Sequence, residues 1–196
     1  MVTRVAENPS QKTAHPEKLI TGEALYEMSS VESAELVQGV IVHHMPTGHL
    51  HGLIESIITT LLFNFVRPRK LGRVFSGEVG IYIQRNPDTI RAADVAFVST
   101  ERVAHIKSHS YLDVAPELIV EVMSPNDSWS EVHQKLEEYF SIGVELIWIV
   151  DPKLQQIHVY QSLDSVQRLS INDTLTGGSV LPGFEAAVAE LFDTEM

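Results

Sequence analysis

The 196-residue sequence contains no cysteine, which excludes disulfide bonds and thiolate metal ligands. No uninterrupted apolar run approaches the ~20 residues of a membrane-spanning helix, and the N-terminal region lacks the apolar core of a signal peptide. Basic residues are also scarce, since 14 Lys and Arg oppose 26 Asp and Glu and leave a net charge of −12. Such a charge argues against a tight nonspecific nucleic-acid binder, because phosphate neutralisation needs a basic surface. We expect a cytoplasmic protein, in which bound metal ions or clustered basic residues would have to supply positive charge for any nucleic-acid chemistry.

The length and the 44% hydrophobic content suit one domain with a substantial core. Residues 1–18 are polar and contain two prolines, so we expect a flexible leader there and a single domain over residues 19–196. The patterns predict a short helix over 21–30, a β-hairpin over 35–45 around Gly39, and a long amphipathic helix over 49–66 that Pro68 and Gly72 end. A second hairpin is predicted from strands over 73–84 and 89–99.

The second half of the chain predicts more strands around one further helix. The run APELIVEVMSP, residues 115–125, is apolar enough for a strand buried on both faces. Ser128 and Glu131 have the spacing of a capping box, and the helix that follows should end at Gly143. Strands are predicted over 146–151 and 156–161, with a short strand and one helical turn after Gly178. Together these elements predict an α/β or α+β domain, with a mixed sheet flanked by helices.

Two acidic residues interrupt otherwise apolar strands. Glu121 lies within LIVEVM, and Asp94 lies within IRAADVAFV. An ionised carboxylate in an apolar interior costs several kcal/mol unless a cation or hydrogen bonds compensate it. Carboxylates on neighbouring strands would repel each other unless a cation lay between them, and oxygen ligands suit Mg²⁺ or Mn²⁺. The alternative is that each acid pairs separately with a basic side chain or a backbone amide.

Lys135 and several residues of the N-terminal half are further candidates. Lys135 flanks the buried stripe of the helix that follows the Glu121 strand, so its ammonium could reach back over the sheet, or it could be a solvated lysine paired with Glu131 or Glu138. His51 and Glu55 lie one turn apart on the polar flank of the long helix, where a supporting role at a site is possible. We favour the alternative that the histidines around Pro46 and Gly48 are exposed in a loop between the hairpin and the helix. Glu55 and Glu78 are lesser candidates for an additional acidic metal ligand. The histidines show no HExxH or similar zinc spacing.

Several segments together resemble the Uma-two family, a group of restriction-endonuclease-like proteins in the PD-(D/E)xK nuclease superfamily. The resemblance is carried by RAADVAFV, APELIVEVMSPND, Lys135 four residues before Tyr139, and GVELIWIVDP. The hairpin ELVQGVIVHHMP, the helix HLHGLIESIITTL and the tail VLPGFEAAVAELF fit the same family. The resemblance covers about residues 25–193, and it implies a restriction endonuclease-like αβββαβ core.

The resemblance also implies a catalytic site. Asp94 would be the aspartate of the motif and Glu121 its second acid, and both would hold Mg²⁺ or Mn²⁺ together with the main-chain carbonyl of Val122. The residue before Asp94 is Ala93 rather than proline, and Met123 stands where the motif has lysine. Lys135 resembles the relocated lysine of some branches of the superfamily. It would orient the attacking water or stabilise the anionic transition state.

The resemblance implies a metal-dependent endonuclease that hydrolyses DNA phosphodiester bonds, and a homodimer that could cut both strands of a duplex. Two alternatives stay open. One is a catalytically degenerate nuclease fold that binds DNA or protein, and the other is a nuclease-fold subunit of a mobile-element or regulatory complex. The acidic charge and Met123 favour these alternatives, whereas the presence of Asp94, Glu121 and Lys135 favours the enzyme.

Overall fold

The structure is a computed structural model that describes residues 19–28, 34–125 and 127–193, so the predicted leader lies outside the described residues. The helices are α1 (Gly22–Glu27), α2 (His49–Arg69), α3 (Thr100–Val103), α4 (Trp129–Ser141) and α5 (Val188–Leu191). The strands are β1 (Ala34–Val37), β2 (Val40–His43), β3 (Gly72–Gln84), β4 (Thr89–Ser99), β5 (Leu118–Val122), β6 (Leu146–Asp151), β7 (Gln156–Ser162), β8 (Ser165–Leu169), β9 (Thr174–Gly177) and β10 (Leu181–Ala187).

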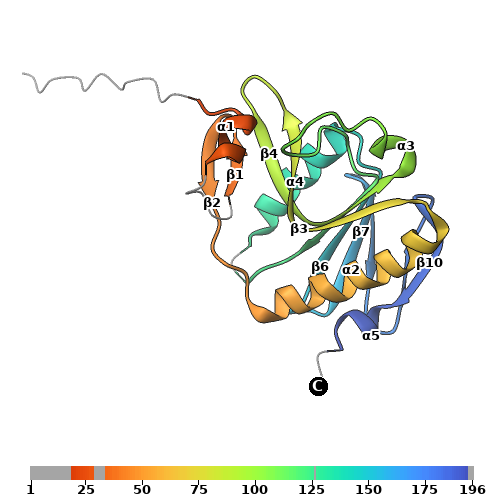
Figure 1. Cartoon of the computed structure of the whole chain (residues 1–196). Coiled ribbons are helices and arrows are strands. Elements are labelled where there is room, and N and C mark those ends of the chain that lie inside the picture. Colours follow the sequence, from red (N-terminus) through yellow and green to blue (C-terminus); the bar gives the residue numbers. More distant parts are fainter. Residues whose placement is uncertain (1–18, 29–33, 126, 194–196) are drawn as a thin grey trace, which may run out of the picture.

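An eight-stranded mixed sheet forms the centre of the molecule. Its order is β2-β1-β4-β5-β6-β7-β8, and β3 also pairs with β4. Only β5 and β6 pair in parallel among these neighbours, and the other pairs are antiparallel. The parallel pair is joined by α4, as a βαβ crossover requires. In Figure 1, α2 and α4 lie on opposite faces of this sheet, which confirms the predicted mixed sheet flanked by helices.

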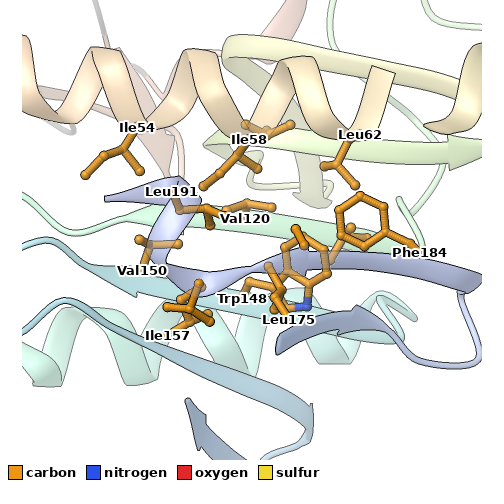
Figure 2. Close-up of a cluster of buried hydrophobic side chains, with 14 of the residues drawn as sticks. Ile54, Ile58, Leu62, Val120, Trp148, Val150, Ile157, Leu175, Phe184 and Leu191 are labelled. Carbon is orange, nitrogen blue, oxygen red and sulfur yellow. The ribbon is translucent and has the colours of Figure 1, made fainter. Parts of the chain in front are cut away.

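The β5 strand is buried on both faces, as its apolar run predicts. Val120 belongs to the core cluster under α2, whereas Ile119 belongs to the cluster under α4. On the α2 side, Ile54, Ile58 and Leu62 pack against the sheet, and β10 and α5 close the same cluster (Figure 2). The helix α4 buries Val132, Leu136 and Tyr139 against the other face.

The helix α2 is longer than the segment predicted from the sequence. Its 21 residues would be sufficient, by length and composition alone, to cross a membrane. The statement about uninterrupted apolar runs stands, because Glu55, Asn64 and Arg67 interrupt this helix. The stripe of Ile54, Ile58, Leu62 and Val66 is buried in the core of the domain. Because this face packs on the sheet, we describe α2 as a core helix.

The local signals for α4 are confirmed, whereas the end of α2 is shifted. Ser128 and Glu131 form both hydrogen bonds of a capping box, and Gly143 has the positive φ of 97° that favours glycine after a helix. By contrast, Pro68 lies inside the last turn of α2, and the helix ends at Lys70, which adopts a left-handed conformation. The sequence analysis predicted the β10 strand and the α5 turn but missed the short strands β8 and β9. Most residues of β8 are exposed and show no alternation, and β9 alternates over only four residues.

The strand β4 has three neighbours, and this branching positions the site. One edge of β4 pairs with β3 along nearly its whole length. On the other edge, β1 pairs with β4 at Ile90, and β5 pairs with it from Val95 to Phe97. The strands β1 and β5 therefore diverge beside residues 91–94, and within the described ranges no strand pairs with this segment of β4 on that edge.

Candidate active site

Side chains replace the missing strand where β1 and β5 diverge. The main-chain N–H of Ala92 donates to Glu35 Oε1 at 3.0 Å, and its carbonyl accepts from Lys135 Nζ at 3.4 Å. A cleft of about 310 Å³ opens at this point. The residues that line it include His51, Glu78, Asp94, Glu121, Val122 and Lys135. The gap between β1 and β5 is therefore a cleft lined mainly by polar residues, of which His51 and Asp94 are buried.

Asp94 is 7% exposed and is held by both a strand and a helix. Its Oδ2 accepts the main-chain N–H of Val122 at 2.6 Å and lies 3.3 Å from His51 Nε2. The first contact continues the β4–β5 ladder with a side-chain oxygen, and the second reaches α2. These contacts fix one carboxylate oxygen at the floor of the cleft.

His51 and Glu55 place a second polar layer beside Asp94. Ligand atoms of the three residues all lie within 4.8 Å of one another. A bulge in β3 at Gly77 and Glu78 lies opposite Asp94, and the Gly77 N–H donates to Glu55 Oε1 at 2.8 Å. Burial raises the pKa of Glu55, and the negative charges of Asp94 and Glu78 raise it further. Burial lowers the pKa of His51, but Asp94 and Glu55 outweigh burial and leave that pKa above its usual value.

Glu121 lies on the same cleft but is held from the α4 side. Tyr139 Oη donates to its Oε1 at 2.6 Å, and Lys135 Nζ donates to its Oε2 at 3.2 Å. Burial raises the pKa of Glu121 to about 7, since the Lys135 charge offsets the desolvation only in part and the charge of Asp94 adds to it. A carboxyl group with this pKa exchanges its proton near neutral pH.

Lys135 joins Glu121 to a buried charge network. Its Nζ lies 3.2 Å from Glu35 Oε1 as well as 3.2 Å from Glu121 Oε2. Burial lowers the pKa of Lys135, but these two acids outweigh burial and raise that pKa, so the ammonium stays charged. Glu35 also accepts from Arg91 at 2.7 Å, and Arg91 pairs in turn with Glu138. Lys135 is therefore not the solvated lysine of the alternative, paired with Glu131 or Glu138.

The remaining predicted positions divide between the cleft and the core. Val122 lines the cleft, and its backbone contributes to the raised pKa of His51, so its main chain lies at the imidazole. Glu78 also lines the cleft. Met123, at the position of the motif lysine, packs against the core under α4. The structure thus brings Asp94, Glu121, Val122 and Lys135 to one cleft, together with His51 and Glu78. Glu55 lies beside this cleft, next to Asp94 and His51.

The donor set fits a divalent cation. Carboxylate oxygens of Asp94, Glu55 and Glu121 and the carbonyl of Val122 are the hard ligands that Mg²⁺ and Mn²⁺ take. The imidazole of His51 adds a nitrogen, and its Nδ1 is buried with no hydrogen-bond partner in the part of the chain that the structure describes. An unpaired buried polar atom of this kind marks an incomplete environment. The strongest electrostatic feature of the cleft is its excess of acids, which a cation would balance.

The sequence analysis missed Glu35 and Arg91 and gave Tyr139 no role at the site. Glu35 is 1% exposed, although it stands at the start of a short hairpin strand. A signal for both residues exists, since Arg91 lies in the same apolar run as Asp94 and a buried arginine requires an acidic partner. The partner lies 56 positions earlier in the chain, and sequence alone does not identify it.

Comparisons with known proteins identify the family and the fold of the chain. A family model, Uma2, described as "Putative restriction endonuclease", matches residues 23–189. Among solved structures, the crystal structure of a "putative nuclease belonging to DUF820" from Anabaena variabilis ATCC 29413 superposes with a TM-score of 0.73 at 20% identity. That match covers 88% of this chain and 97% of the other and shows a shared fold. No curated protein matches the chain. Because the family model spans most of the sequence, this chain belongs to the Uma2 (Uma-two) family.

Proposed function

We propose that this protein is an endonuclease that hydrolyses DNA phosphodiester bonds with Mg²⁺ or Mn²⁺. The observation that carries the proposal is the meeting of Asp94, Glu121 and Lys135 in one cleft. They come from β4, β5 and α4 in a chain of the restriction endonuclease-like family. The two acids and the half-buried ammonium come from separate elements and meet at the open edge of a strand. Such a group can act on a phosphodiester, whereas a purely structural ion pair would need only one acid and one base.

Asp94, Glu121 and the Val122 carbonyl would hold the cation. When bound, the cation would lower the pKa of a coordinated water and offset charge that develops on the phosphate. The role of Asp94 follows from its fixed Oδ2, which the Val122 amide orients at 2.6 Å. Burial deprives the Glu121 carboxylate of solvation and raises its pKa to about 7. A bound cation would stabilise the ionised form and so allow Glu121 to lose its proton.

Lys135 would act on the reacting groups rather than on the cation. Its ammonium is kept charged by Glu35 and Glu121 and lies at the cleft. This half-buried ammonium can donate a hydrogen bond to an attacking water or to a phosphate oxygen, and such preorganised donors stabilise developing negative charge. Tyr139 and Glu35 would keep Glu121 and Lys135 in place, because each contacts one of them directly.

A second candidate is a nuclease fold that has lost catalysis and binds DNA or protein. Met123 at the motif lysine position and the net charge of −12 favour it. In this case Lys135 and Glu121 would form a structural ion pair, as the distance of 3.2 Å permits. Activity measurements separate the two candidates.

The test is the cleavage of supercoiled plasmid DNA by the purified protein. We expect nicked and linear products with Mg²⁺ or Mn²⁺ and none with excess chelator, because the cation would activate the attacking water and compensate the charge that develops on the phosphate. A matched single-stranded RNA substrate in the same assay decides between DNA and RNA. Intact DNA at all metal concentrations, with the protein still folded, would favour the binding module.

A further inference from the structure

We propose that His51 is a direct nitrogen ligand of a metal site formed with Asp94 and Glu55, and that this site selects Mn²⁺ over Mg²⁺. The inference deepens the proposed function and rests on its metal site. It adds a donor from α2 to the acids of the sheet, and it names the class of metal that the cleft takes. Metal binding of this kind can be measured without any DNA.

The first observation is an unsatisfied buried imidazole. The His51 side chain is only 8% exposed, and its Nδ1 has no hydrogen-bond partner among the described residues. A neutral imidazole has one N–H and one lone pair. If Nε2 carries the hydrogen and donates to Asp94, a buried lone pair remains on Nδ1. If Nδ1 carries it, the Nε2 lone pair faces a carboxylate oxygen. Neither tautomer satisfies both nitrogens. A cation beside Nε2 removes the lone-pair repulsion of the second arrangement, and the Nδ1–H then still has no partner among the described residues.

The second observation is the distance between potential ligand atoms. His51 Nε2 lies 3.3 Å from Asp94 Oδ2, and the ligand atoms of His51, Glu55 and Asp94 lie within 4.8 Å of one another. Metal–ligand bonds of about 2.1 Å at right angles separate two ligand atoms by about 3 Å. The His51–Asp94 distance is thus close to the separation of neighbouring ligands on one cation.

The third observation is that secondary-structure elements and main-chain hydrogen bonds hold the three ligands in place. His51 and Glu55 lie four residues apart on α2, so both project from the same face of one helix. Glu55 accepts the N–H of Gly77 in the β3 bulge, and Asp94 accepts that of Val122 in β5. Because a helix, a bulge and a strand fix three donors around one point, the cluster is preorganised for a ligand.

The nitrogen donor determines the preference. Mg²⁺ takes oxygen ligands almost exclusively and keeps several waters, whereas imidazole binds more strongly to first-row transition metals. His44, another histidine at the cleft, lies 3.3 Å from Glu35 and has a side chain that is 41% exposed. His51 is therefore the histidine whose burial and neighbours suit coordination.

The experiment compares metal binding by the wild type, His51→Ala and His49→Ala. His49 is an exposed histidine in the same turn of α2, so its substitution is the matched control. Calorimetric titration with Mn²⁺ and Mg²⁺ gives the affinities, and pulsed electron paramagnetic resonance of the Mn²⁺ complex detects a coordinated nitrogen. We expect Mn²⁺ to bind the wild type at least about tenfold more tightly than Mg²⁺. In His51→Ala that preference and the nitrogen signal should both be lost, whereas His49→Ala should keep both.

Other outcomes overturn the inference. A wild-type Mn²⁺ complex without a nitrogen signal contradicts it, and this spectrum needs no variant, so poor folding of His51→Ala cannot obscure the answer. A nitrogen signal that persists in His51→Ala assigns the ligand to another histidine and also contradicts it. Failure of the proposed function gives a different result from failure of this inference. If Mn²⁺ binds through His51 and DNA is not cleaved, the proposed nuclease activity is contradicted and the metal ligand is supported. If DNA is cleaved and no nitrogen is coordinated, the nuclease activity is supported and the metal ligand is contradicted.

Discussion

Glu121 is an acidic residue in an apolar strand. The other four residues of β5 are buried, and the Glu121 carboxyl group accepts hydrogen bonds from Lys135 and Tyr139. Burial is the larger effect on its proton equilibrium, so the pKa rises to about 7 although a lysine lies 3.2 Å away. A carboxyl group in this state is poised to exchange its proton for a cation.

This state predicts how Glu121→Gln changes stability with pH. The pKa of Glu121 is about 7 in the folded protein and 4.5 in the reference state. The protonated Glu121 carboxyl group therefore contributes fully to the stability of the folded state below pH 4.5, and this contribution is lost as the pH rises through 7. The loss amounts to about 3 kcal/mol in the free energy of unfolding. The amide that replaces the carboxyl group cannot ionise, and Lys135 keeps Glu35 as a partner. We therefore expect the variant to gain stability relative to the wild type between pH 5 and pH 8, as measured by urea unfolding without metal.

The opposite result is equally informative. If Glu121→Gln unfolds far more easily than the wild type at pH 8, then Glu121 contributes a structural ion pair whose loss outweighs desolvation. Breaking a buried pair of that kind costs about 3–5 kcal/mol. If the unfolding of the wild type also does not change when Mg²⁺ is added, Glu121 has a structural role only.

Among the elements, those with strong local patterns could be predicted from the sequence. The apolar stripe of α2, the capping box of α4 and the unbroken apolar run of β5 each follow from short-range rules, and the structure has all three. Asp94 and Glu121 could be singled out because a charge in an apolar run is conspicuous. Glu35 could not, since its burial arises only when β1 pairs with β4 and its strand is four residues long.

Two glycines in the elements around the site predict opposite effects of alanine. Gly52 lies in α2 with nothing within 4 Å of an added Cβ, so Gly52→Ala should stabilise the protein by up to about 1 kcal/mol. Gly77 in the β3 bulge has a φ of +82°, which L-residues avoid, so Gly77→Ala should destabilise it by about 1 kcal/mol. Thermal unfolding of both variants measures the difference. Equal shifts for the two would mean that the bulge does not depend on the left-handed backbone.

The cleft and its ligand cluster could not be predicted from the sequence, because they depend on the arrangement of the whole molecule. The cleft exists because β1 and β5 share one edge of β4 and diverge beside Ala92, and such branching depends on pairings far apart in the chain. The ligand cluster of His51, Glu55 and Asp94 likewise joins α2 to β4. Helical spacing indicates that His51 and Glu55 share a face, but nothing local indicates that this face meets Asp94.

We also predict that the protein is a homodimer, since cutting both strands of a duplex usually needs two sites. Sedimentation equilibrium at micromolar concentration should then give about twice the 21.8 kDa mass of the chain. A 21.8 kDa species alone would contradict the dimer. It would restrict the proposed activity to one strand per binding event.

The most direct test of the proposed nuclease is metal-dependent plasmid cleavage by Asp94→Asn beside Asp88→Asn. Both residues are buried aspartates whose Oδ2 accepts a main-chain N–H, Asp94 from Val122 and Asp88 from Gly22, but Asp88 lies in the turn between β3 and β4. If Asp94 holds the cation, Asp94→Asn should lose cleavage by at least about a hundredfold, a loss of roughly 3 kcal/mol in transition-state stabilisation. Asp88→Asn should cleave like the wild type once folding is matched. Cleavage that survives in Asp94→Asn, or falls equally in both variants, would contradict a catalytic site at this cleft.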